Sequence, residues 1–543
     1  MSKTISEPYD YIIVGSGFGG SVAAMRLSEK GYNVLVIEKG KHFRSKDFPK
    51  TNWNLKKYLW MPLIKCFGFQ KLSFFNKVFI LSGVGVGGGS LVYANTHMHP
   101  PESFFKNDAW SRFKDWKMVL APFYKTANFM LGSTPAKATN IEDELLREVA
   151  MDMGRENSYA KVDVGVYYGD TKTAVDPYFN GHGPLRNGCT ECAGCMVGCR
   201  ENAKNTLDKN YLYFAQSNGA RIHAETLVEK IIFDKEMGEY TVETHCSTKY
   251  FKRNKQQFKT KGIILSGGVL GTLDLLLKQK YTYKTLPKLS DTLGENLRTN
   301  SESLIGVISK EVKLNNGVAI SSVFNPDDDT HIELVKFPNG SSSMVKMATI
   351  AVDEQNPLLR LLKFPIEIIK HPRRFLRMLF GSKLAENSVI LLVMQSLDNA
   401  LKMTWKKGLF GAHLSIQATH GKLTVPAYIP IGQKVMHKYA EKVKGFGANA
   451  ITEIGFNMSS TAHIIGGCPM GENATNGTVD TLFNVFNYPN MKIMDASIIP
   501  CNLGVNPSLT ITALSEYAMS QVPEKEGNIK VKLEDKIARK AVL

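Results

Sequence analysis

The sequence predicts an α/β fold in which a Rossmann-like domain carries an inserted α+β domain built on an antiparallel sheet. The first observation is an apolar strand at residues 11–14 that leads into the spacing G-x-G-x-x-G. The second is a later strand-to-glycine turn at 261–272, which is typical of another βα unit of the same domain. The third is a series of strand-like runs within 300–450, where glycine motifs are absent.

The glycine motif near the N-terminus predicts a dinucleotide site. Because residues 11–14 form an unbroken apolar run, we expect a parallel strand that is covered on both faces. Gly15 allows a sharp turn, Gly17 lets a pyrophosphate approach the backbone, and Gly20 lets the next helix pack closely. We expect that helix over 19–30.

Glu38 ends the second apolar strand, at residues 34–37. A carboxylate at this position accepts hydrogen bonds from ribose hydroxyls and repels a 2′-phosphate. Strand, glycines, helix, strand and acid therefore follow one another in the order of a dinucleotide fold. The early position of the motif and the sequence Glu-Lys-Gly resemble FAD-containing oxidoreductases more than NAD dehydrogenases.

Length and charge restrict the classes of function. A chain of 543 residues needs two domains or two interleaved lobes. The net charge is +17, but no nucleic-acid recognition motif accompanies it, so we expect no nucleic-acid partner. No signal peptide and no apolar run of about 18 residues occurs, so we expect a cytoplasmic location, with membrane association as an option.

Two segments, 48–80 and 357–384, mix large apolar residues with lysines and arginines. The first is interpreted as a flap over an apolar site, or alternatively as a buried connector. In the second, Pro365 and Pro372 are expected to delimit short helices, which form either a basic lid or core helices. Two such covers favour a large apolar substrate and peripheral contact with a membrane.

The glycine-rich segment 82–95 is predicted to wrap a second part of the same cofactor rather than form a flexible loop. A later strand is expected to pass the adenine, with backbone contacts from Val228.

Four cysteines follow the spacing C-x2-C-x2-C-x3-C, which is that of the bacterial ferredoxin run. The run predicts either an iron–sulfur cluster or zinc, or else unmetallated structural thiols. The candidate ligands are Cys189, Cys192, Cys195 and Cys199.

The C-terminal stretch, 456–516, carries the candidate catalytic groups. His463 precedes two glycines and is therefore expected on a tight turn. A neutral imidazole can take the hydroxyl proton of an alcohol while a hydride leaves the carbon. Asn506 stands before Pro507, where an extended backbone is favoured, and a helix begins near Ser508.

Together these stretches resemble the glucose–methanol–choline oxidoreductases, and most closely their cholesterol oxidase branch. The residues that carry the resemblance are Gly15–Gly20, Gly87–Val92, Ile264–Gly268, His463–Gly467, Asp495–Ser497 and Gly504–Leu514. One departure is Tyr93, which stands where those oxidases have asparagine, although Asn95 is near.

The resemblance implies FAD-dependent oxidation of the 3β-hydroxyl of a sterol to a ketone, with O2 as acceptor and H2O2 as product. It implies that His463 is the catalytic histidine, that Asn506 is its partner, and that Glu386 shifts the 5-ene to the 4-ene. The alternatives are a dehydrogenase that acts on another bulky lipid alcohol and passes electrons to a quinone or protein, or a non-catalytic lipid-binding flavoprotein.

The same resemblance yields a set of cofactor-binding residues and a domain order. The cofactor-binding residues are Gly15, Gly17, Phe18, Gly19, Gly20, Glu38, Gly85, Gly89, Ser90, Asn95, Val228, Asp495, Asn506 and Pro507. The expected order is 1–100 (FAD-binding, first part), 101–200 (substrate-side segment with the cysteines), 201–300 (FAD-binding, second part), 301–450 (substrate-binding), 451–525 (FAD-binding, C-terminal part with the catalytic residues) and 526–543 (polar tail).

Overall fold

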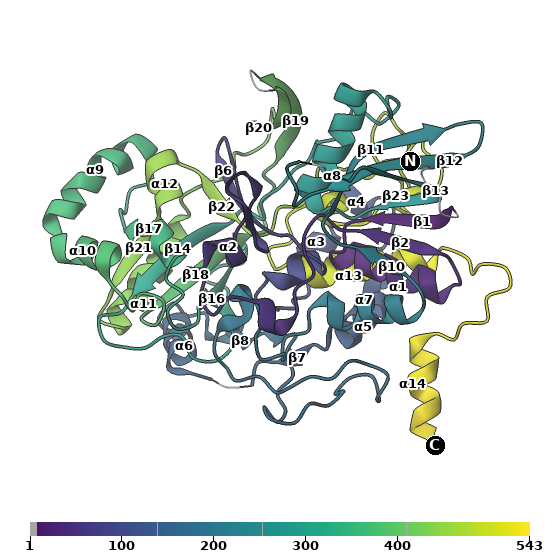
Figure 1. The fold of residues 1–543 in the computed structure, drawn as a ribbon. Helices are drawn as coiled ribbons and strands as arrows, with labels where there is room; N and C mark the ends of the chain where they lie inside the picture. Colours follow the sequence, from purple (N-terminus) through teal and green to yellow (C-terminus); the bar gives the residue numbers. More distant parts are fainter. Residues whose placement is uncertain (1–7, 138, 252–253, 409–410, 543) are drawn as a thin grey trace.

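The computed structural model describes residues 8–137, 139–251, 254–408 and 411–542. The chain forms one lobe around a largely parallel sheet and a second lobe around an antiparallel sheet (Figure 1). The predicted α/β class, with its Rossmann-like domain and separate antiparallel sheet, is therefore confirmed.

The first sheet takes its strands from three separate parts of the chain. Within the described residues, its strands are β1 (Tyr9–Val14), β2 (Val34–Ile37), β10 (Arg221–His223), β11 (Thr226–Asp234), β12 (Glu239–Cys246), β13 (Gln256–Leu265) and β23 (Met491–Ile493). Their order is β10-β2-β1-β13-β12-β11, and β23 also pairs with β13. The pairs on both sides of β1 are parallel. Because Ile12 and Ile13 are fully buried, the central strand is covered on both faces, as its apolar run predicts.

Helices pack against this sheet and against one another. Their bounds are α1 (Phe18–Glu29), α5 (Trp116–Leu131), α7 (Tyr211–Ser217), α8 (Gly268–Leu277), α13 (Ser508–Ser520) and α14 (Leu533–Val542). α1 contacts both α7 and α13, and α13 also contacts α5. A Cβ at Gly19 would lie 1.6 Å from the Met494 carbonyl oxygen, and one at Gly20 would lie 2.1 Å from that of Gly15. Glycine at both positions therefore allows α1 to lie this close to its neighbours.

The second sheet is antiparallel throughout. Its strands in the described part of the chain are β8 (Ala160–Lys161), β14 (Ser303–Ile308), β15 (Ile320–Phe324), β16 (Thr330–Val335), β17 (Ala348–Ile350), β18 (Ser388–Gln395) and β21 (Phe446–Ala450). The order is β17-β21-β14-β18-β16-β15-β8. α6 (Ile141–Asp152) and α11 (Pro430–Lys442) pack on this sheet and bury Val307 and Leu391 beneath them.

A small sheet connects the segment 48–80 to the C-terminal stretch. It joins β5 (Gln70–Phe75), β6 (Val78–Gly83) and β22 (Ser459–Thr461). The rest of the segment contains α2 (Leu55–Tyr58), β3 (Trp60–Met61) and β4 (Cys66–Phe67). Tyr58 and Phe69 are buried while Leu63 and Phe74 are exposed, so the segment combines a packed connector with an exposed apolar edge.

Two further helices project from the second lobe, α9 (Pro357–Lys370) and α10 (Pro372–Phe380). α10 begins at Pro372 as expected, but the prediction that Pro365 ends a helix is wrong, because α9 continues through it. Proline at 365 leaves the Leu361 carbonyl without its helical donor. Leu361 is exposed, so water can reach this carbonyl. Among the described residues, we find no helix whose length and hydropathy would let it span a bilayer.

Candidate active site

A cavity of about 660 Å³ reaches from the carboxyl ends of β1 and β2 into the antiparallel lobe. Its wall includes Gly15 and Glu38 from the first lobe and Val389 from the second. His463 and Asn506 also line it, although 43 residues separate them in the sequence. The cavity lies where α/β sheets of this type bind ligands, outside the carboxyl ends of the parallel strands.

Most of the predicted cofactor-binding residues line this cavity. Those that do are Gly15, Gly17, Phe18, Gly19, Glu38, Gly89, Val228, Asp495, Asn506 and Pro507. Gly20, Gly85, Ser90 and Asn95 are outside the lining. Gly20 packs against the Gly15 turn instead, and the Ser90 hydroxyl donates to the Gly87 carbonyl at 2.7 Å.

Three helices begin at the cavity wall, with Phe18 opening α1, Gly268 opening α8 and Ser508 opening α13. In the described residues, none of the three N-cap residues caps its own helix with a side chain, and at α8 the Gly267 amide donates to Thr272 Oγ1 at 3.2 Å. Backbone N–H groups at uncapped helix N-termini favour anions. A Cβ at Gly17 would meet no atom within 4 Å, so open space lies above the first of these turns. This arrangement fits the pyrophosphate of the predicted FAD.

We expect Gly17→Val to abolish most FAD binding while the protein still folds. The backbone of Gly17 is compatible with an L-residue, with φ −71°, so the new side chain would fill cavity space without straining the chain. The measurement is the flavin-to-protein ratio of the purified variant, expected to fall about tenfold or more. Gly455→Val is the matched control, because its Cβ also meets open space but lies in α12 (Ile451–Phe456), outside the lining. A normal flavin content in Gly17→Val would contradict the placement.

The Glu38 carboxylate is fixed at the edge of the cavity by neighbouring backbone and hydroxyl groups. Oε2 accepts hydrogen bonds from the Ser16 hydroxyl at 2.8 Å and the Ser16 amide at 3.2 Å, and Oε1 accepts from the Gly40 amide at 2.8 Å. Oε1 accepts a single hydrogen bond and keeps a second lone pair, so a ribose hydroxyl can still donate to this oxygen. The ribose contact stays a prediction.

Asn95 is fully buried beside lining residues Ala94 and Thr96. Within the described chain, neither of its side-chain amide atoms has a hydrogen-bond partner. Buried polar atoms of this kind are normally paired, so an amide with both ends free fits a site completed by a polar ligand.

His463 is oriented by a buried carboxylate. Its Nδ1 contacts Oε1 of Glu302, whose Oε2 accepts a hydrogen bond from the Ala462 amide at 2.7 Å. Burial alone would lower the pKa of His463, but the adjacent Glu302 carboxylate raises it above its ordinary value. Because Nδ1 faces Glu302, Nε2 is the ring atom left to face the cavity.

Asn506 lies beside that free ring nitrogen. Its Nδ2 is 3.5 Å from His463 Nε2 and donates a hydrogen bond to Glu333 Oε2 at 3.2 Å. The other oxygen of Glu333 is 3.2 Å from His331 Nε2. Within the described residues, the buried Asn506 Oδ1 has no hydrogen-bond partner. The Glu333 contact therefore fixes the amide so that its oxygen is free to accept from a ligand hydroxyl.

Glu386 is not brought to this pair. Its Oε1 accepts a hydrogen bond from the Gly340 amide at 3.1 Å, and Glu386 is not part of the cavity lining. It precedes β18 at the end remote from Gln395, whereas Glu333 lies within the neighbouring strand β16. The carboxylates that contact the pair are Glu302 and Glu333.

Sequence reasoning missed both of these carboxylates. Glu333 is the single charged residue in the strand Thr330–Val335, and every residue of that strand is buried. Glu302 stands immediately before the apolar strand β14. A charge within a buried apolar strand requires a partner, and this signal could have identified Glu333.

The structure gives no support for a metal site at the cysteine run. In the described residues, no three His, Cys, Asp or Glu side chains gather in a group that could hold a metal ion, so neither an iron–sulfur cluster nor zinc is supported. Cys192 is exposed, whereas Cys195 is buried in an apolar cluster. Burial raises the pKa of the Cys195 thiol to about 11 and also raises the pKa of Cys189, as expected for structural thiols.

A buried lysine connects the cysteine run to the glycine-rich segment. Lys204 Nζ donates hydrogen bonds to the carbonyls of Tyr93 and Cys195, both at 2.8 Å, and to that of Leu91 at 3.2 Å. Burial lowers the pKa of Lys204 to about 7. Lys204 thus links the glycine-rich segment, through two hydrogen bonds, to the cysteine run, through one. Tyr93 of that segment packs edge-on against Phe18 at the start of α1.

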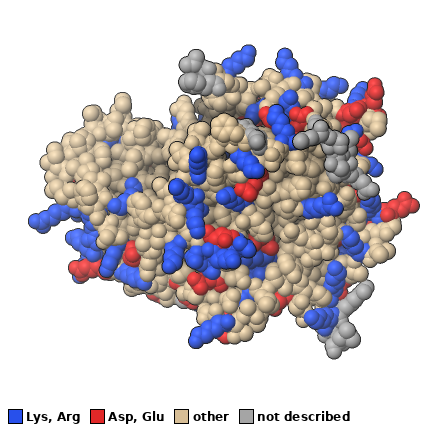
Figure 2. Space-filling view, viewed as in Figure 1, with Lys and Arg blue, Asp and Glu red and all other residues tan. Residues whose placement is uncertain are grey.

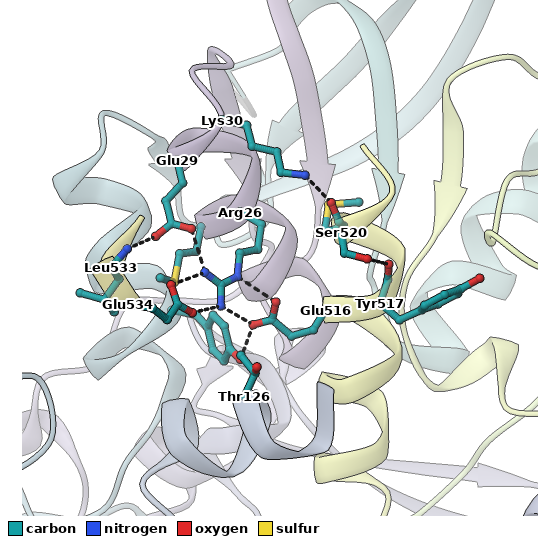
Figure 3. Close-up of polar contacts among 12 residues, drawn as sticks. Arg26, Glu29, Lys30, Thr126, Glu516, Tyr517, Ser520, Leu533 and Glu534 are labelled. Atoms are coloured by element: carbon teal, nitrogen blue, oxygen red, sulfur yellow. Dashed lines mark hydrogen bonds and ion pairs between the residues drawn. The ribbon is translucent and has the colours of Figure 1, made fainter. Parts of the chain in front are cut away.

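An arginine joins α1 and α13 near the ends that lie away from the cavity. Figure 3 shows Arg26 of α1 among three carboxylates, Glu29, Glu516 of α13 and Glu534 of α14. The Arg26 Nε to Glu516 distance is 2.8 Å, and the Nη2 to Glu534 distance is 2.6 Å. A buried pair of this kind fixes geometry more than it adds stability.

Sequence comparison identifies relatives along almost the whole chain. Residues 185–299 and 412–515 match the N-terminal and C-terminal models of the GMC oxidoreductases, and residues 13–56 match an NAD(P)-binding Rossmann-like domain. A cholesterol oxidase from Acinetobacter baumannii is 42% identical over 95% of each chain. One from Mycobacterium tuberculosis is 41% identical over 95% of this chain and 91% of its own.

More distant relatives share the same fold. A long-chain-alcohol oxidase from Arabidopsis thaliana is 24% identical and matches over 94% of this chain and 67% of its own. The crystal structure of pyridoxine 4-oxidase from Mesorbium loti superimposes with a TM-score of 0.60 over 94% of this chain and 99% of its own, at 14% identity. The family-model matches and the identities of 41% and 42% show that the chain belongs to the GMC oxidoreductases, as an FAD-dependent alcohol oxidoreductase of that family.

Proposed function

We propose that this enzyme oxidises the 3β-hydroxyl of a sterol to a ketone, with O2 as acceptor and H2O2 as product. The observation that carries the proposal is 42% identity over 95% of the chain to a cholesterol oxidase. The cavity supports it, because apolar side chains of the antiparallel lobe, such as Leu304, Val335 and Val389, share its wall with His463. A fused hydrocarbon ring system needs an apolar wall of this kind with only a few polar groups at one end.

The polar end of the cavity provides a proton acceptor. With Nδ1 held by Glu302, the neutral imidazole presents the Nε2 lone pair, which can take the substrate hydroxyl proton. The Glu302 carboxylate then stabilises the imidazolium that forms. Asn506 Oδ1 can accept from the same hydroxyl and orient it before transfer. FAD, when bound, accepts the hydride that leaves the carbinol carbon.

We extend the proposal to isomerisation of the 5-ene to the conjugated 4-ene. This step needs a carboxylate that moves a proton from C4 to C6. Because Glu386 is bonded to Gly340 away from the lining, we assign the role to Glu333, which contacts Asn506. Glu333 is fully buried, so its carboxylate is shielded from competing water protons.

The test is incubation of the purified enzyme with cholesterol under air. We expect H2O2 and enone in a one-to-one ratio. A peroxidase-coupled colour assay measures the H2O2, and ultraviolet absorbance measures the enone. Ketone formation without enone absorbance would remove the isomerisation. If no sterol bleaches the flavin under anaerobic conditions, the sterol proposal is wrong.

A second substrate class is a long-chain primary alcohol. The observation that favours it is the similarity to the Arabidopsis thaliana long-chain-alcohol oxidase. Anaerobic flavin bleaching by hexadecanol, compared with cholesterol at equal concentration, separates the two classes. The same experiment, with a quinone added in place of air, shows whether O2 or a quinone reoxidises the flavin.

A further inference from the structure

The helices α9 and α10 present their apolar side chains to the outside of the molecule. The exposed residues are Leu358, Leu359, Leu361, Leu362, Ile366, Ile369, Leu376, Leu379 and Phe380. Three of them, Leu358, Ile369 and Phe380, have 74%, 79% and 77% of their surface exposed. A contiguous patch of this size is unusual on a monomer surface and marks an interaction site.

The orientation of α9 is fixed by a charged residue on its inner side. Arg360 is fully buried and donates hydrogen bonds to the Asn457 side-chain oxygen at 2.7 Å and to the Glu453 carbonyl at 3.3 Å. It also donates to the Glu354 carbonyl at 3.2 Å. Rotating the helix to bury its leucines would break these bonds and remove the partners of the Arg360 guanidinium. The hydrogen bonds of Arg360 therefore hold the apolar face of α9 toward the outside.

The patch carries an excess of positive charge. Between residues 356 and 384 the acidic residue is Glu367, and the basic residues, apart from the inward-facing Arg360, are Lys363, Lys370, Arg373, Arg374, Arg377 and Lys383. Arg373 and Arg374 are exposed at the start of α10. Figure 2 shows this end of the molecule as a mostly uncharged surface with basic side chains along its lower edge. Apolar side chains bordered by basic ones are typical of surfaces that lie on anionic lipid.

A continuous apolar region connects the patch with the cavity. Phe364, Ile368 and Phe375, on the inner sides of α9 and α10, pack on a buried cluster. Four members of that cluster, Ile308, Phe337, Val345 and Ala448, also line the cavity. One layer of apolar side chains thus lies between the surface patch and the cavity that holds His463 and Asn506.

We propose that α9 and α10 dock on an anionic lipid bilayer, with their exposed leucines, isoleucines and phenylalanine in the acyl boundary and Arg373 and Arg374 at the headgroups. An apolar substrate would then pass between bilayer and cavity through the cluster beneath them. A second copy of this chain fits the patch less well, because a symmetric interface would bring the two sets of arginines together.

The experiment is co-sedimentation of the full-length holoenzyme with vesicles that contain no sterol, so that binding is measured apart from catalysis. We expect stronger binding to phosphatidylcholine mixed with phosphatidylserine than to phosphatidylcholine alone. Leu362→Glu/Ile369→Glu should lower partition about tenfold or more, because both carboxylates would enter the acyl boundary. The matched control is Met237→Glu/Ile529→Glu, whose sites are 67% and 94% exposed but lie in the first lobe and near the C-terminus.

Two further measurements separate lipid docking from other occupants. Arg373→Glu/Arg374→Glu should remove the preference for phosphatidylserine and its sensitivity to salt, while flavin content stays unchanged. Turnover of sterol in detergent should be normal in Leu362→Glu/Ile369→Glu, and turnover of sterol in vesicles should fall. Equal vesicle binding by this variant and the wild type would overturn the proposal. So would a dimer, seen by sedimentation velocity, that the same substitutions dissociate.

Discussion

Replacing His463 with glutamine is expected to slow flavin reduction by substrate by about 10²- to 10⁴-fold. The Nε2 lone pair of His463 is the atom that faces Asn506 and the cavity, and a glutamine side chain is too weak a base to take a hydroxyl proton. The measurement is stopped-flow absorbance of the flavin under anaerobic conditions, with the alcohol that bleaches the wild-type enzyme. Flavin content should stay near that of the wild type, because the helix N-termini at the cavity are untouched.

His420→Gln provides the control for this substitution. His420 is exposed and lies outside the lining, so its loss should leave both the rate and the flavin content unchanged. A near wild-type rate of flavin reduction in His463→Gln would show that another group accepts the proton.

Replacing Glu302 with glutamine is expected to lower the same rate by about 10²- to 10⁴-fold, as when a histidine is held in the wrong tautomer. The glutamine amide can donate to Nδ1, and this would place the ring proton on Nε2, where the substrate proton must go. The Glu302 carboxylate also raises the pKa of His463. Its loss should lower that pKa, and the acid limb of the rate profile should move to lower pH.

The direction of the pH shift separates a positioning role from a general loss of structure. The wild-type rate should rise as pH passes upward through the raised pKa of His463, since only the neutral ring accepts a proton. Glu295→Gln is the matched control, because Glu295 is partly exposed, paired with Lys402 and absent from the lining. An unchanged acid limb in Glu302→Gln would contradict the proposed coupling, whatever the size of the rate loss.

The Rossmann-like part of the fold could be predicted because its signals are local. The strand at 11–14, the glycines at 15, 17 and 20, and the acid at 38 all lie within one short stretch, and each has a distinct steric or hydrogen-bonding role. Helix α1 begins one residue earlier and ends one residue earlier than predicted, which is the normal uncertainty of helix ends.

The proximity of His463 and Asn506 could be predicted from their motif, whereas the two carboxylates that contact them were missed. Glu302 and Glu333 lie 161 and 173 residues from the side chains they contact. These contacts depend on where β14 and β16 lie in the antiparallel sheet, and the periodicity of the sequence does not predict that arrangement. Glu386 and Glu302 share the pattern of an acid before an apolar strand, so sequence alone could not tell which of the two lies beside His463.

The cysteine run and Pro365 show where local rules were overruled. The spacing of the cysteines matches a cluster motif, yet the fold buries Cys195 and leaves Cys192 at the surface, and within the described residues the run does not gather into a metal-binding group. Pro365 is tolerated inside α9 because the carbonyl that it leaves unpaired lies at an exposed position. In both cases the tertiary structure, and not the local sequence pattern, determines whether the cysteines gather and whether the helix ends.

The ionic cluster at Arg26 has a consequence for the opposite ends of the helices that it joins. One guanidinium is shared by α1, α13 and α14, and the first two have their opposite ends at the cavity. Neither helix can slide along its axis without breaking a contact to the same cation. The distance between the two helix N-termini at the cavity is therefore fixed on the remote side of the molecule, by residues outside the cavity lining.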